Sequence, residues 1–256
     1  MLHLEPHRLR VPDFVARVEY SQSIDSTNDA ARRLAVEVPP GAGLLVVAEE
    51  QTAGRGRGVN KWWTGAGSLA FSLLFDPSRY AIETRFSCMV PLAAAVAIVD
   101  VVTRRMGTPA VGIRWPNDVY IGPRKLAGIL VEALADGRQI LGIGLNANNS
   151  LAEAPPEVAS LAASLVDELG GLLDKTELLA ELLTGLDEVF LKLGNDRQEL
   201  AAIADELCLQ RGQPLTIQAG EERVGGVCAG IADDGAVLLD TPAGRRAIYS
   251  GVTVKT

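Results

Sequence analysis

A glycine–arginine run between two apolar segments constrains the fold of this chain more than any other stretch. The run reads Gln51-Thr-Ala-Gly-Arg-Gly-Arg-Gly58, and the segments that flank it are 44–48 and 68–75. Both flanking segments are short, continuous apolar runs, which predicts two strands joined by this loop. Glycine lets a backbone approach a ligand closely, and arginine offers a fixed fork of donors to phosphate or carboxylate. The sequence therefore predicts an anion-binding loop held between two strands.

A solvated arginine–glycine linker, as found in disordered RNA-binding tails, is the alternative interpretation. Such tails are long and repetitive, whereas this run occurs once and lies inside apolar sequence. The formal net charge of the 256-residue chain is -8. This charge disfavours broad binding to DNA, because phosphate contacts need a surplus of lysine and arginine. We therefore expect a local ligand site and no nucleic-acid partner.

The apolar pattern and the cysteines predict a cytoplasmic protein. Residues 1–16 lack the continuous apolar core of a signal peptide. The most apolar run, 90–102, is interrupted by a proline and an aspartate, so we expect a buried helix over 84–105 and no membrane partner. The three cysteines are widely separated and follow no metal-ligand spacing, which predicts free, buried thiols.

The residue pattern divides the chain into a large and a small unit. Residues 1–210 mix predicted strands with long helical segments, which is an α+β pattern. Residues 211–254 are rich in glycine, valine and isoleucine with closely spaced turns, which predicts about five short strands. We therefore predict one domain over 1–210 and a second over 211–256.

A second group of polar residues lies in a predicted antiparallel meander of three strands. Turns at Gly122-Pro123 and Asp136-Gly137 separate these strands. Folding the chain about the two turns places Asp118 opposite Ala127, and Ala127 opposite Asn146. The register determines which side chains share a face, because alternation along a strand has a period of two.

Alternation predicts one apolar face and one face that is polar or empty. The predicted polar face carries Gly112, Arg114, Asp118, Lys125, Ala127, Gly142, Gly144 and Asn146. The predicted core face carries Val111, Ile113, Trp115, Leu126, Leu130, Leu141, Ile143 and Leu145. A solvated face is the alternative interpretation. Glycine is costly inside strands, and Asp118, Lys125 and Asn146 converge at one end, so we predict a binding surface.

Together these motifs resemble those of the biotin protein ligases. In chain order they are Asp25-Ser-Thr-Asn28, Gln51-Thr-Ala-Gly-Arg-Gly-Arg57, Lys61-Trp62, Trp115-Pro-Asn-Asp118, Lys125-Leu-Ala-Gly-Ile-Leu130 and Gly144-Leu-Asn146. The sequence departs from the family pattern at Arg114, where lysine often stands, and after Arg57, where Gly-Val-Asn replaces a further basic cluster. Because the first motif ends by residue 28, we expect the stand-alone form without a DNA-binding domain.

The resemblance implies a fold and a reaction. The fold is α+β, with a catalytic domain of the class II aminoacyl-tRNA synthetase and biotin synthetase type, namely a mixed, mainly antiparallel sheet flanked by helices. A small SH3-like β-barrel follows it. The implied enzyme is an ATP-dependent ligase that activates biotin as biotinyl-5′-AMP and transfers it to a lysine of a biotin carrier protein, such as the acetyl-CoA carboxylase carrier subunit. ATP and biotin are substrates, Mg²⁺ is the cofactor, and the protein is a monomer or homodimer.

Two other functions stay open at this point. A lipoate or octanoate ligase or transferase shares the catalytic fold but lacks this glycine–arginine loop and the Trp-Pro-Asn-Asp motif. A biotin-sensing regulator without ligase activity would need a DNA- or partner-binding module, and the sequence offers none that we recognise.

The resemblance also assigns roles residue by residue. The implied biotin-binding residues are Ser26, Thr27, Asn28, Gln51, Gly54, Arg55, Gly56, Arg57, Lys125 and Gly128. The implied ATP-binding residues are Arg55, Arg57, Trp62, Asn117, Lys125 and Asn146. The implied catalytic residues are Arg55, Arg57, Asp118 and Lys125. Asp118 would either hold Mg²⁺ or orient the incoming lysine amine, and Trp62 would either pack on the adenine or belong to the core.

Overall fold

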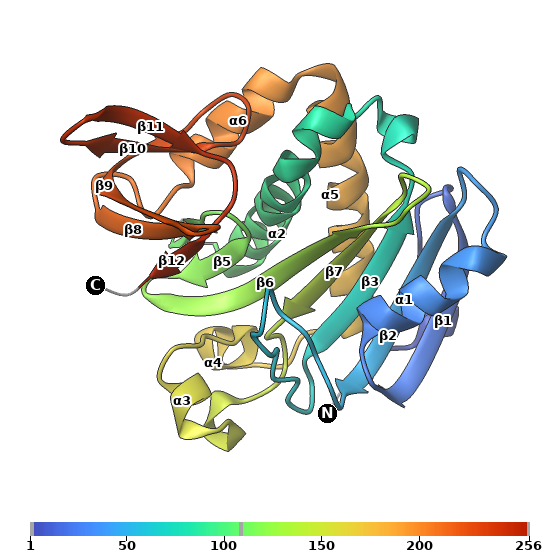
Figure 1. The fold of residues 1–256 in the computed structure, drawn as a ribbon. Coiled ribbons are helices and arrows are strands. Elements are labelled where there is room, and N and C mark those ends of the chain that lie inside the picture. Colours follow the sequence, from blue (N-terminus) through green and yellow to red (C-terminus); the bar gives the residue numbers. More distant parts are fainter. Residues whose placement is uncertain (1–2, 108–109, 255–256) are drawn as a thin grey trace.

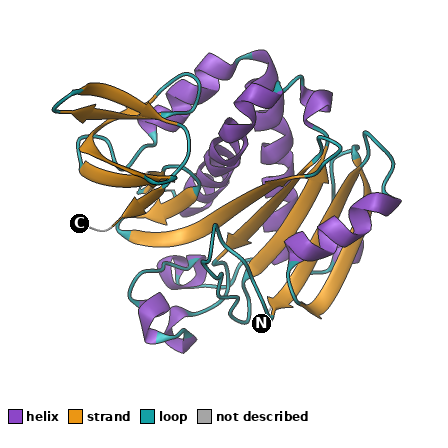
Figure 2. Ribbon diagram, viewed as in Figure 1, coloured by secondary structure: helices purple, strands orange, loops and turns teal. Residues whose placement is uncertain are grey.

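Two separate sheets organise the molecule, with helices around the larger one (Figure 1, Figure 2). The structure is a computed structural model that describes residues 3–107 and 110–254. In spatial order the larger sheet contains β1 (Val15–Ile24), β2 (Gly43–Gln51), β3 (Leu69–Phe75), β7 (Gln139–Leu145), β6 (Arg124–Ala133), β5 (Asp118–Ile121) and β4 (Val111–Arg114). β1 and β2 run parallel, and the other neighbouring pairs are antiparallel. The expected mixed, mainly antiparallel sheet is therefore confirmed.

Helices cover both faces of this sheet. α1 (Thr27–Leu34) lies on one face, and α2 (Val90–Met106) and α5 (Lys175–Asn195) pack together on the other (Figure 1). All seven residues of β3 are buried, because helices cover both faces of this strand, and six of the seven are apolar. The other helices are η1 (Pro6–Arg8), η2 (Ala35–Glu37), η3 (Pro77–Tyr80), η4 (Thr84–Met89), η5 (Leu151–Glu153), α3 (Pro156–Ala159), α4 (Leu165–Leu169) and α6 (Arg197–Glu206).

The most apolar helix belongs to the core, as expected. The segment Thr84–Met106 has the length and apolarity of a membrane span, yet 67% of its most apolar window is buried inside the protein. Pro91 lies in the first turn of α2, where its missing N–H leaves no helical hydrogen bond unmade. The first six residues of the expected helix form the 3₁₀ helix η4 instead.

The predicted register of the meander is correct beside the first turn, where Tyr120 pairs with Lys125, but it is wrong by one residue farther along β5 and β6 and at the second turn. Asp118 pairs with Gly128, because an irregularity in the β5–β6 pairing leaves Leu126 without a partner. Ala127 pairs with Leu145 and not with Asn146. The second turn is a three-residue connection in which Gly137 has φ 90°, so it is one residue longer than the assumed two-residue turn.

The shifted register changes which side chains face the polar side. Gly128 and Leu130 pair with Gly144 and Gly142, so they belong to the polar face. Ala127 was predicted there but is buried in the core. Leu130 was predicted in the core but lines the cavity described below. The assignments of Asp118 and Lys125 to the polar face are confirmed, because both side chains line the same cavity.

The second sheet forms the carboxy-terminal module. Its spatial order is β11 (Gly244–Ile248), β10 (Val237–Thr241), β9 (Glu222–Ile231), β8 (Pro214–Ala219) and β12 (Val252–Val254). The prediction of about five short strands is confirmed. The indole N–H of Trp115 donates to the backbone carbonyl of Gly235 at 3.0 Å, which ties the module to the start of the Trp-Pro-Asn-Asp motif.

Candidate functional site

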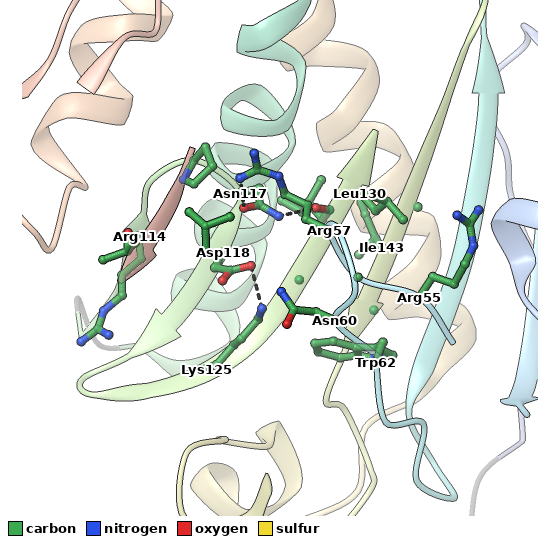
Figure 3. A pocket seen from close by; sticks show the side chains of 18 of the residues that line it. Arg55, Arg57, Asn60, Trp62, Arg114, Asn117, Asp118, Lys125, Leu130 and Ile143 are labelled. Atoms are coloured by element: carbon green, nitrogen blue, oxygen red, sulfur yellow. Dashed lines mark hydrogen bonds and ion pairs between the residues drawn. The ribbon is translucent and has the colours of Figure 1, made fainter. Parts of the chain in front are cut away.

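A cavity of about 640 Å³ lies between the polar face of the larger sheet, the glycine–arginine loop and the carboxy-terminal module (Figure 3). Cavities of this size hold small molecules and cofactors. Most of the predicted site residues line it, namely Ser26, Thr27, Asn28, Gln51, Arg55, Gly56, Arg57, Trp62, Asn117, Asp118, Lys125 and Gly128. Residues from four stretches of the sequence, 26–28, 51–62, 117–118 and 125–128, therefore meet at one site.

Buried polar groups at the start of α1 form one end of the cavity. The side-chain oxygen of Gln51 accepts from the backbone N–H of Thr27 at 2.8 Å and lies 3.1 Å from the Thr27 hydroxyl. The Ser72 hydroxyl contacts the Thr27 hydroxyl at 2.8 Å and the Asn28 side-chain oxygen at 2.6 Å. This end can therefore recognise a ligand that offers both donors and acceptors.

Glycines in β7 and β6 make room for these side chains. A Cβ on Gly142 would collide with the amide of Asn28. A Cβ on Gly144 would collide with the indole of Trp62, and one on Gly128 would lie 3.1 Å from the same ring. The empty positions of the polar face are therefore filled by side chains of the site itself. Trp62 forms a wall of the cavity and belongs to neither cluster of the hydrophobic core.

Asp118 and Lys125 form an ion pair at the centre of the cavity. Their charged atoms are 2.7 Å apart, and Figure 3 shows the two side chains pointing at one another from β5 and β6. The Lys125 ammonium lies 5.7 Å from the centre of the Trp62 ring, within range of a cation–π interaction. A cation and a carboxylate therefore stand side by side against an aromatic wall.

Arg57 brings a second cation toward this pair. Its guanidinium donates to the Gly251 carbonyl at 3.1 Å and to the Asn117 side-chain oxygen at 3.4 Å. Burial lowers the pKa of Arg57, and the nearby Asp118 carboxylate partly offsets that effect. Asn117 is held by its own side-chain N–H, which donates to the Ile129 carbonyl at 2.6 Å.

Arg55 lies on the other side of the loop. In Figure 3 its guanidinium points away from Arg57, Asp118 and Lys125. It donates to Asp29 at 2.7 Å and to Glu132 at 2.7 Å and 3.2 Å. The two arginines of the loop therefore have different surroundings, which their alternation in the sequence does not reveal.

The structure does not bring two predicted residues to the cavity. β7 ends at Leu145, so alternation stops there, and the buried Asn146 side chain donates to the Ala163 carbonyl at 3.0 Å. Gly54 lies beneath the loop, where a Cβ would approach the Trp62 carbonyl to 2.6 Å. Both residues shape the surroundings of the site without facing it.

Several lining residues are absent from the sequence prediction. Arg114, which the sequence placed on the polar face without assigning it a role, stacks on Tyr120 at 4.3 Å from the ring centre and lines the cavity. The carboxy-terminal module and its linker contribute Gln210, Gln213, Leu215, Gly251, Val252 and Thr253. No motif marks these residues. Ser72 supports the lining residues Thr27 and Asn28 from behind, and it was detectable because it is a polar residue inside an otherwise apolar strand.

The described lining residues offer too few ligands to bind a metal ion unless a bound substrate supplies the others. Within residues 3–107 and 110–254 there is no group of three or more histidine, cysteine, aspartate or glutamate side chains arranged for a metal ion. Asp118 is the carboxylate among the lining residues. Mg²⁺ is often bound by one or two carboxylates together with substrate phosphates, so this donor set fits a metal that arrives with a nucleotide.

Family models match most of the chain. Residues 20–148 match the biotin/lipoate A/B protein ligase family, and residues 212–254 match the biotin protein ligase C terminal domain. The biotin–[acetyl-CoA-carboxylase] ligase of Paracoccus denitrificans is 32% identical over 233 residues, which are 88% of this chain and 94% of that protein. The bifunctional ligase/repressor of Bacillus spizizenii is 31% identical over 237 residues, covering 90% of this chain and 71% of that protein.

Solved structures agree with the sequence relatives. The biotin protein ligase of Aquifex aeolicus in complex with biotin and ATP superposes with a TM-score of 0.81 at 28% identity, covering 93% of this chain and 98% of that chain. This likeness, together with the carboxy-terminal family match, confirms the expected catalytic fold and its SH3-like module.

Proposed function

The chain belongs to the biotin protein ligases, and from this membership we propose that it activates biotin with ATP and transfers the biotinyl group to a lysine of a carrier protein. The observation that carries the proposal is the cavity that joins the Ser26–Asn28 helix start, the glycine–arginine loop and the Asp118–Lys125 pair. The ligase relatives and the Aquifex aeolicus complex with biotin and ATP support both substrates.

The buried polar end of the cavity is the proposed biotin site. Ser26, Thr27, Asn28 and Gln51 offer hydroxyl and amide groups, which suit a ureido ring that has two N–H donors and one carbonyl acceptor. Water is excluded there, since Ser26, Thr27 and Asn28 are each under 5% exposed. Hydrogen bonds to Gln51, Ser72 and Glu132 already hold the Thr27 and Asn28 side chains, so these groups are positioned before a ligand binds.

The first chemical step brings two anions together. The biotin carboxylate oxygen attacks the α-phosphorus of ATP, the bond to the bridging oxygen breaks, and pyrophosphate leaves with the electron pair. Two unit charges about 4 Å apart repel by roughly 4 kcal/mol when the effective dielectric constant is about 20. Cations are therefore required to bring the two anions together. Arg57 and Lys125 are the proposed cations, and Asn117 and Trp62 would help to place the nucleotide.

Mg²⁺ is proposed as the metal of this step. Bound to the phosphates, it would neutralise part of the charge that develops on the leaving pyrophosphate. Asp118 would supply the protein ligand, as the carboxylate at the centre of the cavity. In the alternative role, Asp118 orients the ε-amine of the carrier lysine, which attacks the carbonyl of the mixed anhydride and releases AMP.

The Asp118→Asn variant distinguishes the metal-binding role of Asp118 from its role in orienting the lysine amine. If Asp118 holds the metal, Asp118→Asn lowers biotin-dependent exchange of pyrophosphate into ATP by about 10²-fold or more, because the step loses its anionic ligand. If Asp118 orients the amine, the variant keeps exchange and loses transfer to the carrier. Exchange and transfer that both match the unmodified enzyme would rule out both roles.

The remaining parts of the proposal concern the whole protein. We propose domains of residues 1–210 and 211–256, supported by the separate second sheet and by the family match over 212–254. The proposed partner is a biotin carrier protein domain, and the proposed location is the cytoplasm, which suits the free thiols of Cys88, Cys208 and Cys228. We expect a monomer or a homodimer that does not bind nucleic acid.

One assay tests the proposed function against its rivals. Purified protein is incubated with ATP, labelled pyrophosphate and either biotin, lipoate or octanoate. A biotin protein ligase gives exchange with biotin alone, whereas a lipoate or octanoate ligase gives exchange with the other acids. No exchange with any of the three acids would refute an adenylating enzyme and leave either a biotin-sensing regulator or a transferase that takes its acyl group from an already activated donor.

A further inference from the structure

A charged cluster lies behind the glycine–arginine loop, on the side opposite Asp118. Glu132, from β6, sits at its centre with 19% of its side chain exposed. Its two oxygens accept from the Arg55 guanidinium at 2.7 Å and 3.2 Å, and one of them also accepts from the Asn28 amide at 2.7 Å. The other oxygen lies 3.1 Å from the Arg32 guanidinium. One carboxylate therefore contacts the loop and the start of α1 at the same time.

Arg55 is fully engaged by this cluster. Besides both oxygens of Glu132, its guanidinium contacts Asp29 at 2.7 Å. Two carboxylates and two arginines form a set with no net charge, because Arg32 adds the second cation. Two neighbouring carboxylates offset the positive charge of the guanidinium, so Arg55 attracts a ligand anion only weakly.

Arg57 has the opposite surroundings. Its partners are a backbone carbonyl and an amide oxygen, and across the described residues no carboxylate lies within ion-pair distance of its guanidinium. Its charge is therefore not neutralised, and in Figure 3 the side chain reaches toward Asn117, on the Asp118 side of the loop. The two arginines that alternate in the loop thus divide into a paired one and an unpaired one.

We propose that Arg55 is a positioning residue of the loop and that Glu132, with Asp29, holds it in place. Arg57 is then the side chain of the loop that meets the ligand anions. Glu132 also holds the amide of Asn28, so the loop and the polar end of the cavity are fixed by one carboxylate. This inference rests on the proposed biotin site for its effect on affinity, but the anchoring of the loop is a property of the protein without ligand.

The anchoring is tested without any substrate. Glu132→Gln keeps the size of the side chain and an oxygen for Asn28, but it removes the charge and the paired acceptors of Arg55. Hydrogen exchange of residues 52–62, followed by mass spectrometry on the ligand-free protein, is expected to be about tenfold faster in this variant. The matched control is Glu19→Gln, which breaks the 2.6 Å pair of Glu19 with Arg17 on the edge strand β1.

The two outcomes of the exchange experiment are distinct. Faster exchange of the loop in Glu132→Gln, with the control unchanged, supports the anchor. Equal exchange in both variants overturns it. Because no biotin is present, this result is independent of whether the protein proves to be a biotin ligase.

A double-mutant cycle then distinguishes an anchoring Arg55 from a ligand-contacting one. Biotin affinity is measured by calorimetry for Arg55→Met, Glu132→Gln and the double variant. If Arg55 acts through Glu132, all three lose affinity by a similar factor, on the order of tenfold, because each breaks the same contact. If Arg55 contacts the ligand anion, Glu132→Gln frees it and affinity is kept or raised, while Arg55→Met alone loses it. That second pattern overturns the inference.

Discussion

Arg57 is the residue at which the loop, the surroundings of Asp118 and the carboxy-terminal module meet. It donates to the Gly251 carbonyl and to Asn117, and it lies close enough to Asp118 for that carboxylate to affect its pKa. In the proposed mechanism, replacing it with glycine would remove a charge-assisted contact to the biotinyl-adenylate and loosen the loop above it. We expect Arg57→Gly to release biotinyl-adenylate about 10 to 100 times faster.

A single-turnover experiment measures this release. Adenylate is formed on the enzyme, the protein is separated from free ligand, and labelled adenylate is followed as it appears in solution. Arg57→Lys keeps the charge and serves as the conservative variant, for which a smaller acceleration is expected. Release from Arg57→Gly at the rate of the unmodified enzyme would exclude a retaining role for this side chain.

Gly142 is required because the Asn28 amide occupies the space where its side chain would be. Gly142→Ala places a Cβ against that amide, so Asn28 must move and its contacts with Ser72 and Glu132 are strained. We expect biotin affinity to fall by about tenfold or more, measured by calorimetry, with the fold retained. Gly171→Ala is the control, because nothing lies within 4 Å of a Cβ there. Equal affinities in the two variants would contradict this account.

At the scale of single residues, motif positions were predictable and supporting positions were not. Gln51, Arg57 and Lys125 stand in distinctive motifs, and all three line the cavity. Asn146 stands in a motif as well, but its strand ends one residue earlier, so its side chain turns into the protein. Glu132 has no motif at all. Its role depends on the loop packing above β6, which is a tertiary contact that local sequence does not encode.

At the scale of elements, strand positions were predictable and register was not. The two turns of the meander were located correctly from Gly122-Pro123 and Asp136-Gly137. The pairing was nevertheless off by one, since the irregularity at Leu126 and the third residue of the second turn depend on local backbone geometry. Two shifts of one residue were enough to exchange Ala127 and Leu130 between the faces.

A buried ion pair joins the start of α5 to β2. The Lys175 ammonium contacts the Glu49 carboxylate, and their side chains are 2% and 11% exposed. Burial tends to raise the pKa of Glu49, but hydrogen bonds from Lys175, the Leu4 backbone N–H and Tyr20 outweigh it and lower the pKa below its usual value of 4.5. The pair therefore stabilises the folded protein at pH values above about 4.5.

The pH dependence of unfolding tests this pair. A carboxyl group whose folded-state pKa is lowered stabilises the fold above its unfolded-state pKa and loses that contribution as the pH falls through the folded-state value. We expect the free energy of unfolding, measured in urea, to fall below about pH 4.5 with a slope that Glu49→Gln reduces. Glu50→Gln, at the exposed neighbouring position, should leave the slope unchanged. An unaltered slope in Glu49→Gln would contradict the assignment.

At the scale of the whole molecule, the two sheets were predictable from the change in composition near residue 210, but their contact was not. The contact uses residues of the site motifs: Arg57 reaches the Gly251 carbonyl, and the Trp115 indole reaches the Gly235 carbonyl. The backbone N–H of Trp115 also donates to the linker residue Gln210 at 2.7 Å. The module therefore forms part of the cavity wall, which explains why Gly251, Val252 and Thr253 line it.

Trp115→Phe tests whether this contact supports activity. The variant keeps an aromatic ring in the core but leaves the Gly235 carbonyl, now without its indole donor, unsatisfied, which costs about 1 to 3 kcal/mol. Because the module then sits less firmly on the cavity, we expect the KM for ATP in pyrophosphate exchange to rise several-fold while the chain stays folded. Glu222→Gln, which weakens the exposed pair of Glu222 with Arg246 within the module, should leave the KM unchanged. If Trp115→Phe lowers the melting temperature but leaves the KM for ATP as it was, the contact stabilises the fold without shaping the site.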